Sequence, residues 1–400
     1  MKRAVTAGAV VLALVAAACA LAWRPGSPLV PRDGGNVSGT APLFLALLIG
    51  AFATYVLALL VIRRSPPSPR AVIVLAAAIQ LVPLAAPLLL STDAWTYWSY
   101  GWIASRGGGN PYVDPPKHFP RNPALPYMGS AWVGTTSVYG PAFTMASEPL
   151  AVVAGGSDAV AAWTYKSLAA AAALAAALLA GRLARRRAFA IALVGWNPVL
   201  AVHLAGGGHN DAWVGALILA ALALSASRRA QGGGVLWALA VGVKWVPILF
   251  LTLRSLEARA TTRPLGGRGL AAAGVAVVLG ATVLYGGAWP LAVFPLVGNA
   301  ALETSYAIPH RLEQLGLPNH AAIGLAEAGL LAGLVWLSRG ALRGRARLGL
   351  AACLVLVTTP YLAVWYLAWA VPLAAAEEDA VATVAVLALC AYLLPQTIPV

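Results

Sequence analysis

The sequence predicts an all-α protein, a polytopic bundle of transmembrane helices that crosses the bilayer about 11 to 13 times. Hydrophobic residues make up 60% of the 400-residue chain and charged residues only 10%, a composition far more apolar than that of soluble domains. Uncharged apolar runs of roughly 17 to 25 residues, enough to cross about 30 Å of hydrocarbon, recur along the whole length. We therefore expect residues 1–400 to form a single integral membrane domain in the cell membrane.

The basic residues indicate how the chain is oriented. A net charge of +14 would suggest nucleic-acid binding in a soluble protein, but here the 27 Lys and Arg residues fall in short clusters between apolar runs. Such clusters set membrane topology, so the expected partner is the lipid bilayer and no nucleic acid is expected. Cys19, Cys353 and Cys390 lie far apart within apolar runs, which excludes a disulfide framework and a cysteine metal site.

The apolar runs give the order of the spans once the N-terminus is placed in the cytoplasm. Transmembrane helices are predicted near residues 4–22, 41–62, 71–90, 158–181, 188–204, 211–227, 269–287, 321–337, 348–359, 361–376 and 380–398. Residues 91–157 then form the longest outer segment, within which 142–154 is expected to be a short interfacial helix.

Residues 234–253 do not fit a single crossing. Arg228 and Arg229 precede this apolar run and Arg254 follows it, so one crossing would place basic clusters on both faces. Lys244 and Pro247 in its middle favour a re-entrant hairpin instead.

Acidic residues gather in the predicted outer segments: Asp93, Asp114, Glu148, Asp158, Asp211, Glu303 and Glu313. Asp93 directly follows the third span, behind Ser91 and Thr92, and opens an aromatic stretch typical of a short helix at the membrane surface. By itself this pattern indicates a helix cap. A helix N-terminus also keeps a carboxylate ionised, however, which suits a general base.

Two further clusters admit both a structural and a functional interpretation. The stretch "GGGHNDAW" (206–213) places His209, Asn210 and Asp211 at the mouth of a span, either as contacts for a sugar or phosphate or as a polar turn with a helix cap. His203 and His209 lack a metalloprotease spacing, so no metal site is predicted there. Lys244 is either functional or extends its charge to the inner headgroups.

The remaining candidates are weak when taken alone. "GGGNPY" (107–112) and "YGP" (139–141) have turn chemistry with tyrosines attached, and Arg311 follows a histidine in an outer loop where it could bind an anion. Trp365 and Tyr366 lie in a run typical of an aromatic belt.

In chain order, however, these motifs resemble the GT-C superfamily of membrane glycosyltransferases, specifically the polyprenol-phosphomannose-dependent α-1,6-mannosyltransferases of actinobacterial envelopes. The resemblance covers most of the chain. It rests on Asp93, Tyr97, Gly101, Asn110-Pro111-Tyr112, Tyr139-Gly140-Pro141, Asn197-Pro198, Gly208-His209-Asn210-Asp211, Lys244 with Pro247, and Trp365-Tyr366.

The resemblance implies a GT-C bundle whose long first outer loop is catalytic, with Asp93 as the catalytic base. The donor would be a polyprenyl-phosphate mannose and the acceptor a hydroxyl of a cell-envelope glycan or glycolipid, joined by an inverting displacement on the outer face. No cofactor is required, and a divalent metal ion is left open. The expected substrate-binding residues are Tyr97, Arg106, Asn110, Tyr112, Tyr139, His209, Asn210, Asp211, Lys244, Arg311, Trp365 and Tyr366. The alternative is a transporter or flippase of a lipid-linked glycan, for which inverted repeats and ionisable residues in mid-membrane would be typical.

Overall fold

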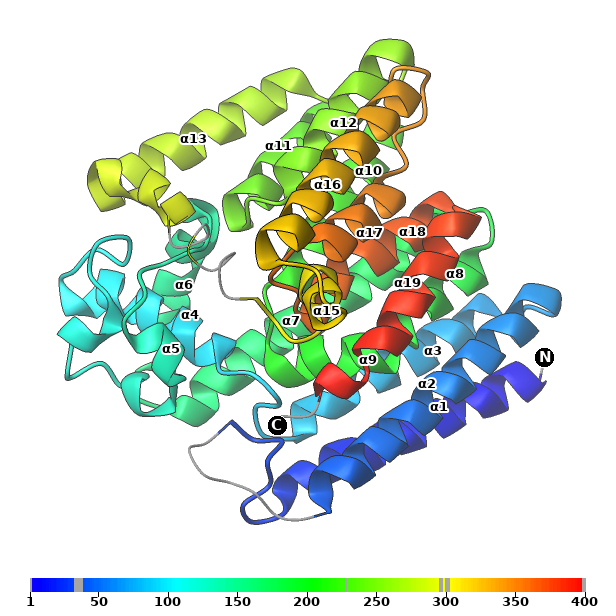
Figure 1. The fold of residues 1–400 in the computed structure, drawn as a ribbon, viewed down its shortest axis with the longest axis horizontal. Helices are drawn as coiled ribbons and strands as arrows, with labels where there is room; N and C mark the ends of the chain where they lie inside the picture. The colour runs from blue at the N-terminus through cyan, green and yellow to red at the C-terminus, as the bar shows by residue number, and fades with distance from the viewer. Residues whose placement is uncertain (1, 32–38, 228, 295–297, 299–302, 398–400) are drawn as a thin grey trace.

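The computed structural model describes residues 2–31, 39–227, 229–294, 298 and 303–397, so Arg228 and part of the predicted outer loop 288–320 lie outside it. The described residues form helices and no strands, which confirms the all-α prediction (Figure 1). The helices are α1 Lys2–Ala20, α2 Thr40–Arg64, α3 Pro69–Leu81, α4 Asp93–Trp102, α5 Ser130–Val133, α6 Pro141–Ala154, α7 Asp158–Leu183, α8 Arg187–Gly195, α9 Pro198–Leu200, α10 Asp211–Ala226, α11 Ala230–Val243, α12 Pro247–Ala260, α13 Gly267–Tyr285, α15 Ile308–Gln314, α16 Asn319–Ala341, α17 Leu348–Thr358, α18 Leu367–Glu377 and α19 Ala380–Leu393.

Only some of these helices reach the length of a full membrane crossing. Among the described residues, five are long and apolar enough, namely α1, α2, α7, α13 and α16 with their helical extensions. A sixth is obtained if α8 and the helix that follows it, bent by 41° at the break, count as one span. Every other predicted span is also helical, but it is built from helices of 10–17 residues. By length and composition, the described helices therefore supply five or six candidate spans, against the 11 to 13 that the sequence predicts.

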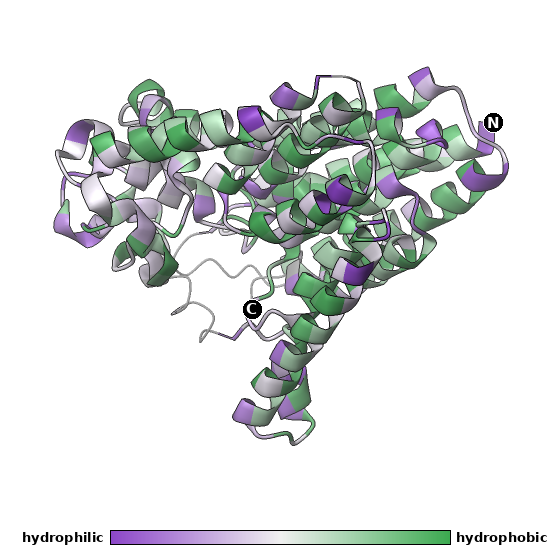
Figure 2. Ribbon diagram, turned by 90° about the horizontal axis from the view of Figure 1, so that it is seen from above, coloured by the Kyte–Doolittle hydropathy of each residue, from purple (hydrophilic) through white to green (hydrophobic). Residues whose placement is uncertain are grey.

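The bundle exposes apolar side chains where a water-soluble protein would bury them. Val283 on α13 is 84% exposed and Leu331 on α16 is 65% exposed. Figure 2 shows hydrophobic residues along the lengths of the helices, with hydrophilic residues concentrated at their ends and in the loops. Apolar surface of this extent indicates contact with lipid.

The third predicted span ends earlier than its apolar pattern indicates. Helix α3 and the 3-10 turn behind it end at Ala85 instead of residue 90, because Pro83 and Pro87 withhold backbone N–H groups. The carbonyl oxygens of Ala86 and Pro87, which follow the end of this helix, accept hydrogen bonds from the buried ammonium of Lys166 on α7. Lys166 therefore fixes the chain just before Asp93.

Residues 230–260 form a helical hairpin. Helix α11 begins beside Gly266, since a Cβ on Gly234 would lie 2.0 Å from the Gly266 carbonyl oxygen. Helix α12 ends near the same segment, where the Arg254 guanidinium donates to the Arg263 carbonyl at 3.0 Å. Fourteen residues of α11 rise only about 21 Å, less than the roughly 30 Å hydrocarbon layer. The hairpin has the predicted shape, and its re-entry into the bilayer stays a prediction.

Three consecutive carboxylates hold the ends of three helices together. Glu377 accepts hydrogen bonds from the Leu348 and Gly349 amides at the start of α17. Glu378 accepts from the Arg185 and Arg186 amides before α8, and Asp379 caps α19. Each carboxylate thus satisfies donors that a helix N-terminus leaves free. We call the end of the bundle that contains Glu377, Glu378 and Asp379, together with neighbouring arginines such as Arg185 and Arg186, the basic end.

The "YGP" turn packs against the tip of the hairpin. The Gly140 amide donates to the Val243 carbonyl at 3.1 Å. A Cβ on Gly140 would lie 2.3 Å from the carbonyl oxygen of Gly242, so a side chain there would push the tip away. Glycine at 140 therefore sets the distance between Tyr139 and Lys244.

Gly140→Ala is expected to separate the turn from the hairpin and to destabilise the protein by about 1–3 kcal/mol, the usual cost of overpacking. Thermal unfolding in detergent micelles should show a lower Tm. Gly156→Ala is the control, because no heavy atom lies within 4 Å of the added Cβ. Equal Tm values for the two variants would contradict a close approach at Gly140.

Candidate active site

A cavity of about 250 Å³ lies where the start of α4, the tip of the α11–α12 hairpin and the segment before α18 meet. Its walls are mainly aromatic, and it holds one carboxylate and one ammonium group. The lining residues are Asp93, Trp132, Val138, Tyr139, Lys244, Trp245, Val246, Val355, Thr359, Tyr361, Trp365, Tyr366 and Trp369.

Local backbone structure fixes Asp93 at the edge of this cavity. The Leu89 amide donates to the Gly206 carbonyl and the Leu90 amide to the Leu29 carbonyl, at 3.0 and 2.8 Å. Leu90 has φ +62°, an unfavourable conformation for a bulky residue. The chain then turns into α4, with the Ser91 hydroxyl accepting from the Asp93 amide at 3.1 Å. Asp93 thus begins the helix, as the sequence predicts.

The Asp93 carboxylate is surrounded by groups that favour its charged form. His209 Nδ1 lies 3.2 Å from Asp93 Oδ2, and the Tyr97 hydroxyl donates to the same oxygen at 3.3 Å. Burial by itself raises the pKa of Asp93, but His209, the charge of Lys244 and the Tyr97 hydroxyl together hold this pKa below the ordinary value for aspartate. Asp93 is therefore ionised at neutral pH and able to accept a proton.

The triple glycine of "GGGHNDAW" allows this arrangement. Gly208 has φ +72°, and a Cβ on it would lie 3.4 Å from the Ala94 Cβ. A Cβ on Gly206 would lie 2.8 Å from a methyl group of Leu89. These glycines therefore allow the segment 89–94 to approach closely. His209 is fully buried beside it and stacks on Trp365, with ring centroids 3.9 Å apart.

Lys244 reaches the cavity from the tip of the hairpin. Its ammonium lies 2.7 Å from Asp211 Oδ1 and above the rings of Tyr366 and Trp369, at 4.7 and 5.3 Å from their centroids. Asp211, the first residue of α10, is fully buried. The side chain therefore points toward Asp211 at the cavity, and not toward headgroups at the basic end.

The predicted site residues fall into three groups. Asp93, Tyr139, Lys244, Trp365 and Tyr366 line the cavity. Buried behind them are Tyr97, His209, Asn210 and Asp211. The Asn210 backbone amide donates to the Tyr97 hydroxyl at 3.5 Å.

The other four predicted residues make contacts elsewhere. Arg106 donates to the Val152 carbonyl at 3.5 Å, and Asn110 donates to the Tyr285 carbonyl at 2.8 Å. The Tyr112 hydroxyl donates to the Tyr139 backbone carbonyl at 3.1 Å, so Tyr112 contacts the site only at the backbone of Tyr139. Arg311 contacts Gln314 and the ring of Tyr306. None of the four lines the described cavity.

Several lining residues were not predicted. Trp245 and Val246 fill the gap between Lys244 and Pro247, and Tyr361 and Trp369 flank Trp365 in the aromatic run, so proximity in sequence was an available signal. Val355 and Thr359, from α17 and its end, carry no local signal.

One described group of side chains has the composition of a metal site. His310 Nδ1 lies 3.2 Å from Glu303 Oε2 and 3.4 Å from Glu313 Oε2, and the Asn319 amide donates to the other oxygen of each carboxylate. Three such ligands could hold a divalent cation. The group does not line the cavity that contains Asp93.

Comparison with known proteins identifies the family of the chain. Residues 3–258 match the family model described as "Alpha-(1->6)-mannopyranosyltransferase, N-terminal domain". The chain is 30% identical over 209 residues to alpha-(1->6)-mannopyranosyltransferase A of Mycobacterium tuberculosis, covering 48% of this chain and 40% of the relative. It is 29% identical over 170 residues to the protein of the same name from Corynebacterium glutamicum, covering 41% and 34%. These matches span less than half the length of the relatives, and no solved structure matches the chain.

The family match extends over more than half of the chain and includes Asp93, His209 and Lys244. The chain therefore belongs to the α-(1→6)-mannopyranosyltransferase family.

Proposed function

We propose that this protein moves a mannose from a polyprenyl-phosphate donor to a hydroxyl of a cell-envelope glycan or glycolipid, with inversion, on the outer face of the membrane. The proposal is carried by one observation: a carboxylate, Asp93, lines the same aromatic cavity as the side-chain amine of Lys244. A proton acceptor and an anion-stabilising cation are the two groups that such a transfer needs.

Lys244 is the group that we assign to the donor phosphate. It is the one cation among the residues described as lining the cavity, whereas Arg106 and Arg311 contact other parts of the chain. The rings of Tyr366 and Trp369 and the carboxylate of Asp211 hold the ammonium in place. A fixed cation stabilises the negative charge that develops on a departing phosphate without reorganising during the reaction.

Asp93 is the group that we assign to the acceptor. As the acceptor oxygen attacks the anomeric carbon, Asp93 takes the hydroxyl proton, and the bond from that carbon to the phosphate oxygen breaks with its electron pair leaving on the phosphate. His209 and Tyr97 orient the carboxylate. A cavity of about 250 Å³ is smaller than sites for drug-sized ligands. It therefore suits one sugar against its aromatic walls, with the lipid tail and the remaining glycan outside.

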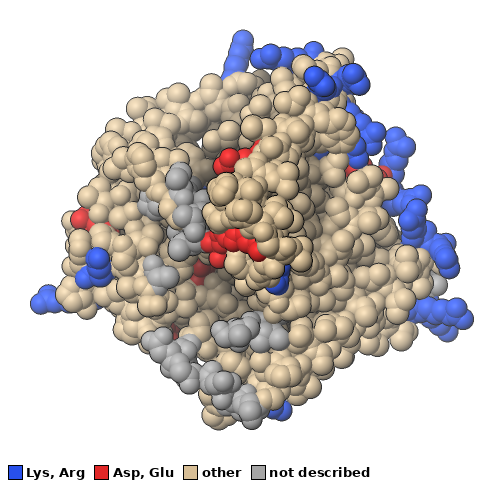
Figure 3. All heavy atoms as spheres, in the orientation of Figure 1, with Lys and Arg blue, Asp and Glu red and all other residues tan. Residues whose placement is uncertain are grey.

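The distribution of charge supports the proposed outer location. Figure 3 shows Lys and Arg side chains gathered along one edge of the molecule, over the loops of the basic end. Helix α10 begins at Asp211 beside the cavity and ends at Ala226 at the basic end. Since basic loops stay in the cytoplasm, the opposite ends of these helices, and the Asp93 cavity with them, face outward.

A transporter or flippase of a lipid-linked glycan remains the competing function. It would require ionisable groups along a path through the membrane. The carboxylates near the cavity, Asp93 and Asp211, instead gather at one end of the bundle with Lys244 and His209. This arrangement, together with family membership, favours an enzyme.

Asp93→Asn keeps the helix start but removes the proton acceptor, so transfer of labelled mannose from a polyprenyl-phosphate donor should fall by about 10²- to 10⁴-fold. Membrane level and Tm should stay near those of the wild type. Asp158→Asn, at the start of α7 and away from the cavity, is the matched control and should retain full transfer. Unchanged transfer by Asp93→Asn would remove this residue from the mechanism.

Lys244 requires a double substitution, because Lys244→Gln alone leaves the buried Asp211 charge unpaired and should destabilise the fold. Adding Asp211→Asn should restore the Tm, while transfer stays reduced by about 10²- to 10³-fold for lack of phosphate stabilisation. If the double variant transfers mannose as the wild type does, Lys244 serves only to neutralise Asp211.

The orientation can be tested with an impermeant maleimide, because the native thiols Cys19, Cys353 and Cys390 are buried. In right-side-out membrane vesicles, a cysteine introduced by Val113→Cys near the cavity side should be labelled at once. One introduced by Arg343→Cys should be labelled only after permeabilisation. The reverse pattern would place the cavity on the cytoplasmic face.

A further inference from the structure

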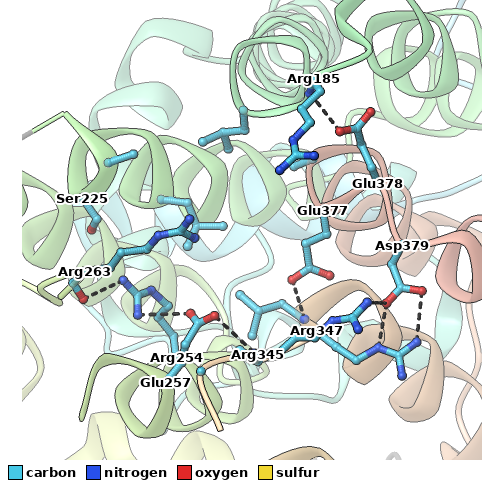
Figure 4. Close-up of a pocket in the computed structure, with 17 residues that line it drawn as sticks. Arg185, Ser225, Arg254, Glu257, Arg263, Arg345, Arg347, Glu377, Glu378 and Asp379 are labelled. Atoms are coloured by element: carbon cyan, nitrogen blue, oxygen red, sulfur yellow. Dashed lines mark hydrogen bonds and ion pairs between the residues drawn. The ribbon is translucent and has the colours of Figure 1, made fainter. Parts of the chain in front are cut away.

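A second, larger cavity of about 530 Å³ lies at the basic end. Its walls come from the ends of α7, α10, α12 and α18 and from the loop before α17. Since α10 begins at the Asp93 cavity with Asp211 and contributes Ser225 here, the two cavities lie roughly 20 Å apart along this helix. Ten charged or hydroxyl residues line it: Arg185, Ser225, Arg254, Glu257, Arg263, Arg345, Arg347, Glu377, Glu378 and Asp379 (Figure 4).

The acidic side chains of this cavity are already engaged. Glu377 accepts from backbone amides at the start of α17, and Glu378 accepts from amides just before α8, at 2.6 to 2.9 Å. Asp379 receives two hydrogen bonds from the Arg347 guanidinium, at 2.7 and 3.1 Å. Glu257 pairs with Arg254 at 3.2 Å. These carboxylates hold the fold together, and the lining carries five arginines against four carboxylates.

Three of the lining arginines, Arg185, Arg263 and Arg345, are not held in a close ion pair with a carboxylate of their own in the part of the chain that the structure describes. Among the residues that the structure describes, no carboxylate lies within ion-pair distance of the Arg185 or Arg263 guanidinium, and the two groups extend toward the cavity from opposite sides (Figure 4). Arg345 lies 3.8 Å from Asp379, which Arg347 already holds, and its side chain is 73% exposed. The mouth of the cavity is accordingly positive.

The wall of the cavity also contains a buried hydroxyl, which lies against Gly233 of α11. The Ser225 hydroxyl belongs to a residue only 7% exposed and has no hydrogen-bond partner in the described part of the chain. Arg254, beside it in the wall, is 2% exposed. A buried hydroxyl without a partner costs free energy unless a ligand or water supplies an oxygen. Guanidinium groups around such a hydroxyl are chemistry suited to a phosphate.

We propose that this cavity binds a phosphate group, and that an anionic phospholipid headgroup at the inner surface supplies it. Basic pockets between transmembrane helices on the cytoplasmic side are suited to such headgroups. The lining comes from several helices and the loop before α17, so a bound headgroup would tie these elements together at the end opposite the Asp93 cavity. The site is independent of the proposed transfer reaction.

The test uses the full chain, purified in a neutral detergent and titrated with phosphatidylglycerol, phosphatidylcholine or inorganic phosphate. Ligands that bind the folded state raise the Tm, and native mass spectrometry counts the bound lipids. Phosphatidylglycerol should raise the Tm more than phosphatidylcholine does. Its affinity for the variant Arg185→Gln/Arg263→Gln should be at least tenfold lower than its affinity for the wild type.

These substitutions leave the fold contacts intact, because Arg185 and Arg263 contribute backbone atoms to them. Arg268→Gln/Arg339→Gln is the control of equal charge loss, since neither residue lines the cavity. In a second outcome, inorganic phosphate raises the Tm as strongly as the lipid does, and this increase is lost only in Arg185→Gln/Arg263→Gln. That result would support a phosphate site whose ligand is a soluble phosphate. Equal lipid binding by the wild type and both double variants would overturn the proposal. No sugar donor is used, so the result does not depend on transfer.

Discussion

Two carboxylates have to remain charged where little water reaches them, and the surrounding structure is built around this constraint. Asp211 is fully buried and Asp93 is 9% exposed. An unpaired charge at such a position costs several kcal/mol. Lys244 from the hairpin pairs with Asp211, and His209, just before α10, contacts Asp93. The start of α4, the start of α10 and the hairpin tip must therefore lie together.

Small residues and a break in the third span allow these elements to meet. Gly140 and Gly242 let the "YGP" turn touch the hairpin tip, and Gly206 and Gly208 let the start of α10 approach segment 89–94. That segment is free to do so because α3 ends early, and Lys166 binds the carbonyls that the break exposes. These close approaches bring the polar ends of α4, α10 and the hairpin to one cavity.

Much of the fold could be predicted from the sequence, because hydrophobic length and charge distribution dictate which segments are helical and where they turn. The helical turn within the predicted segment 234–253 is an example, since the flanking arginines with Lys244 and Pro247 indicate that the chain turns back there. Positions that depend on distant contacts could not be predicted. Arg106 and Arg311 have the right chemistry for a phosphate, but they contact Val152 and Gln314 instead. The glycines before His209 admit protein backbone, which local sequence does not distinguish from ligand. The basic-end cavity likewise combines residues from five separate segments.

The structure of the protein with a bound, non-transferable polyprenyl-phosphate mannose analogue tests the central claim most directly. We expect the phosphate oxygens within hydrogen-bond distance of Lys244 Nζ, and the sugar between the aromatic walls with its anomeric carbon on the side of Asp93. A donor phosphate seated elsewhere, with its sugar remote from Asp93, would contradict the proposed roles of both residues.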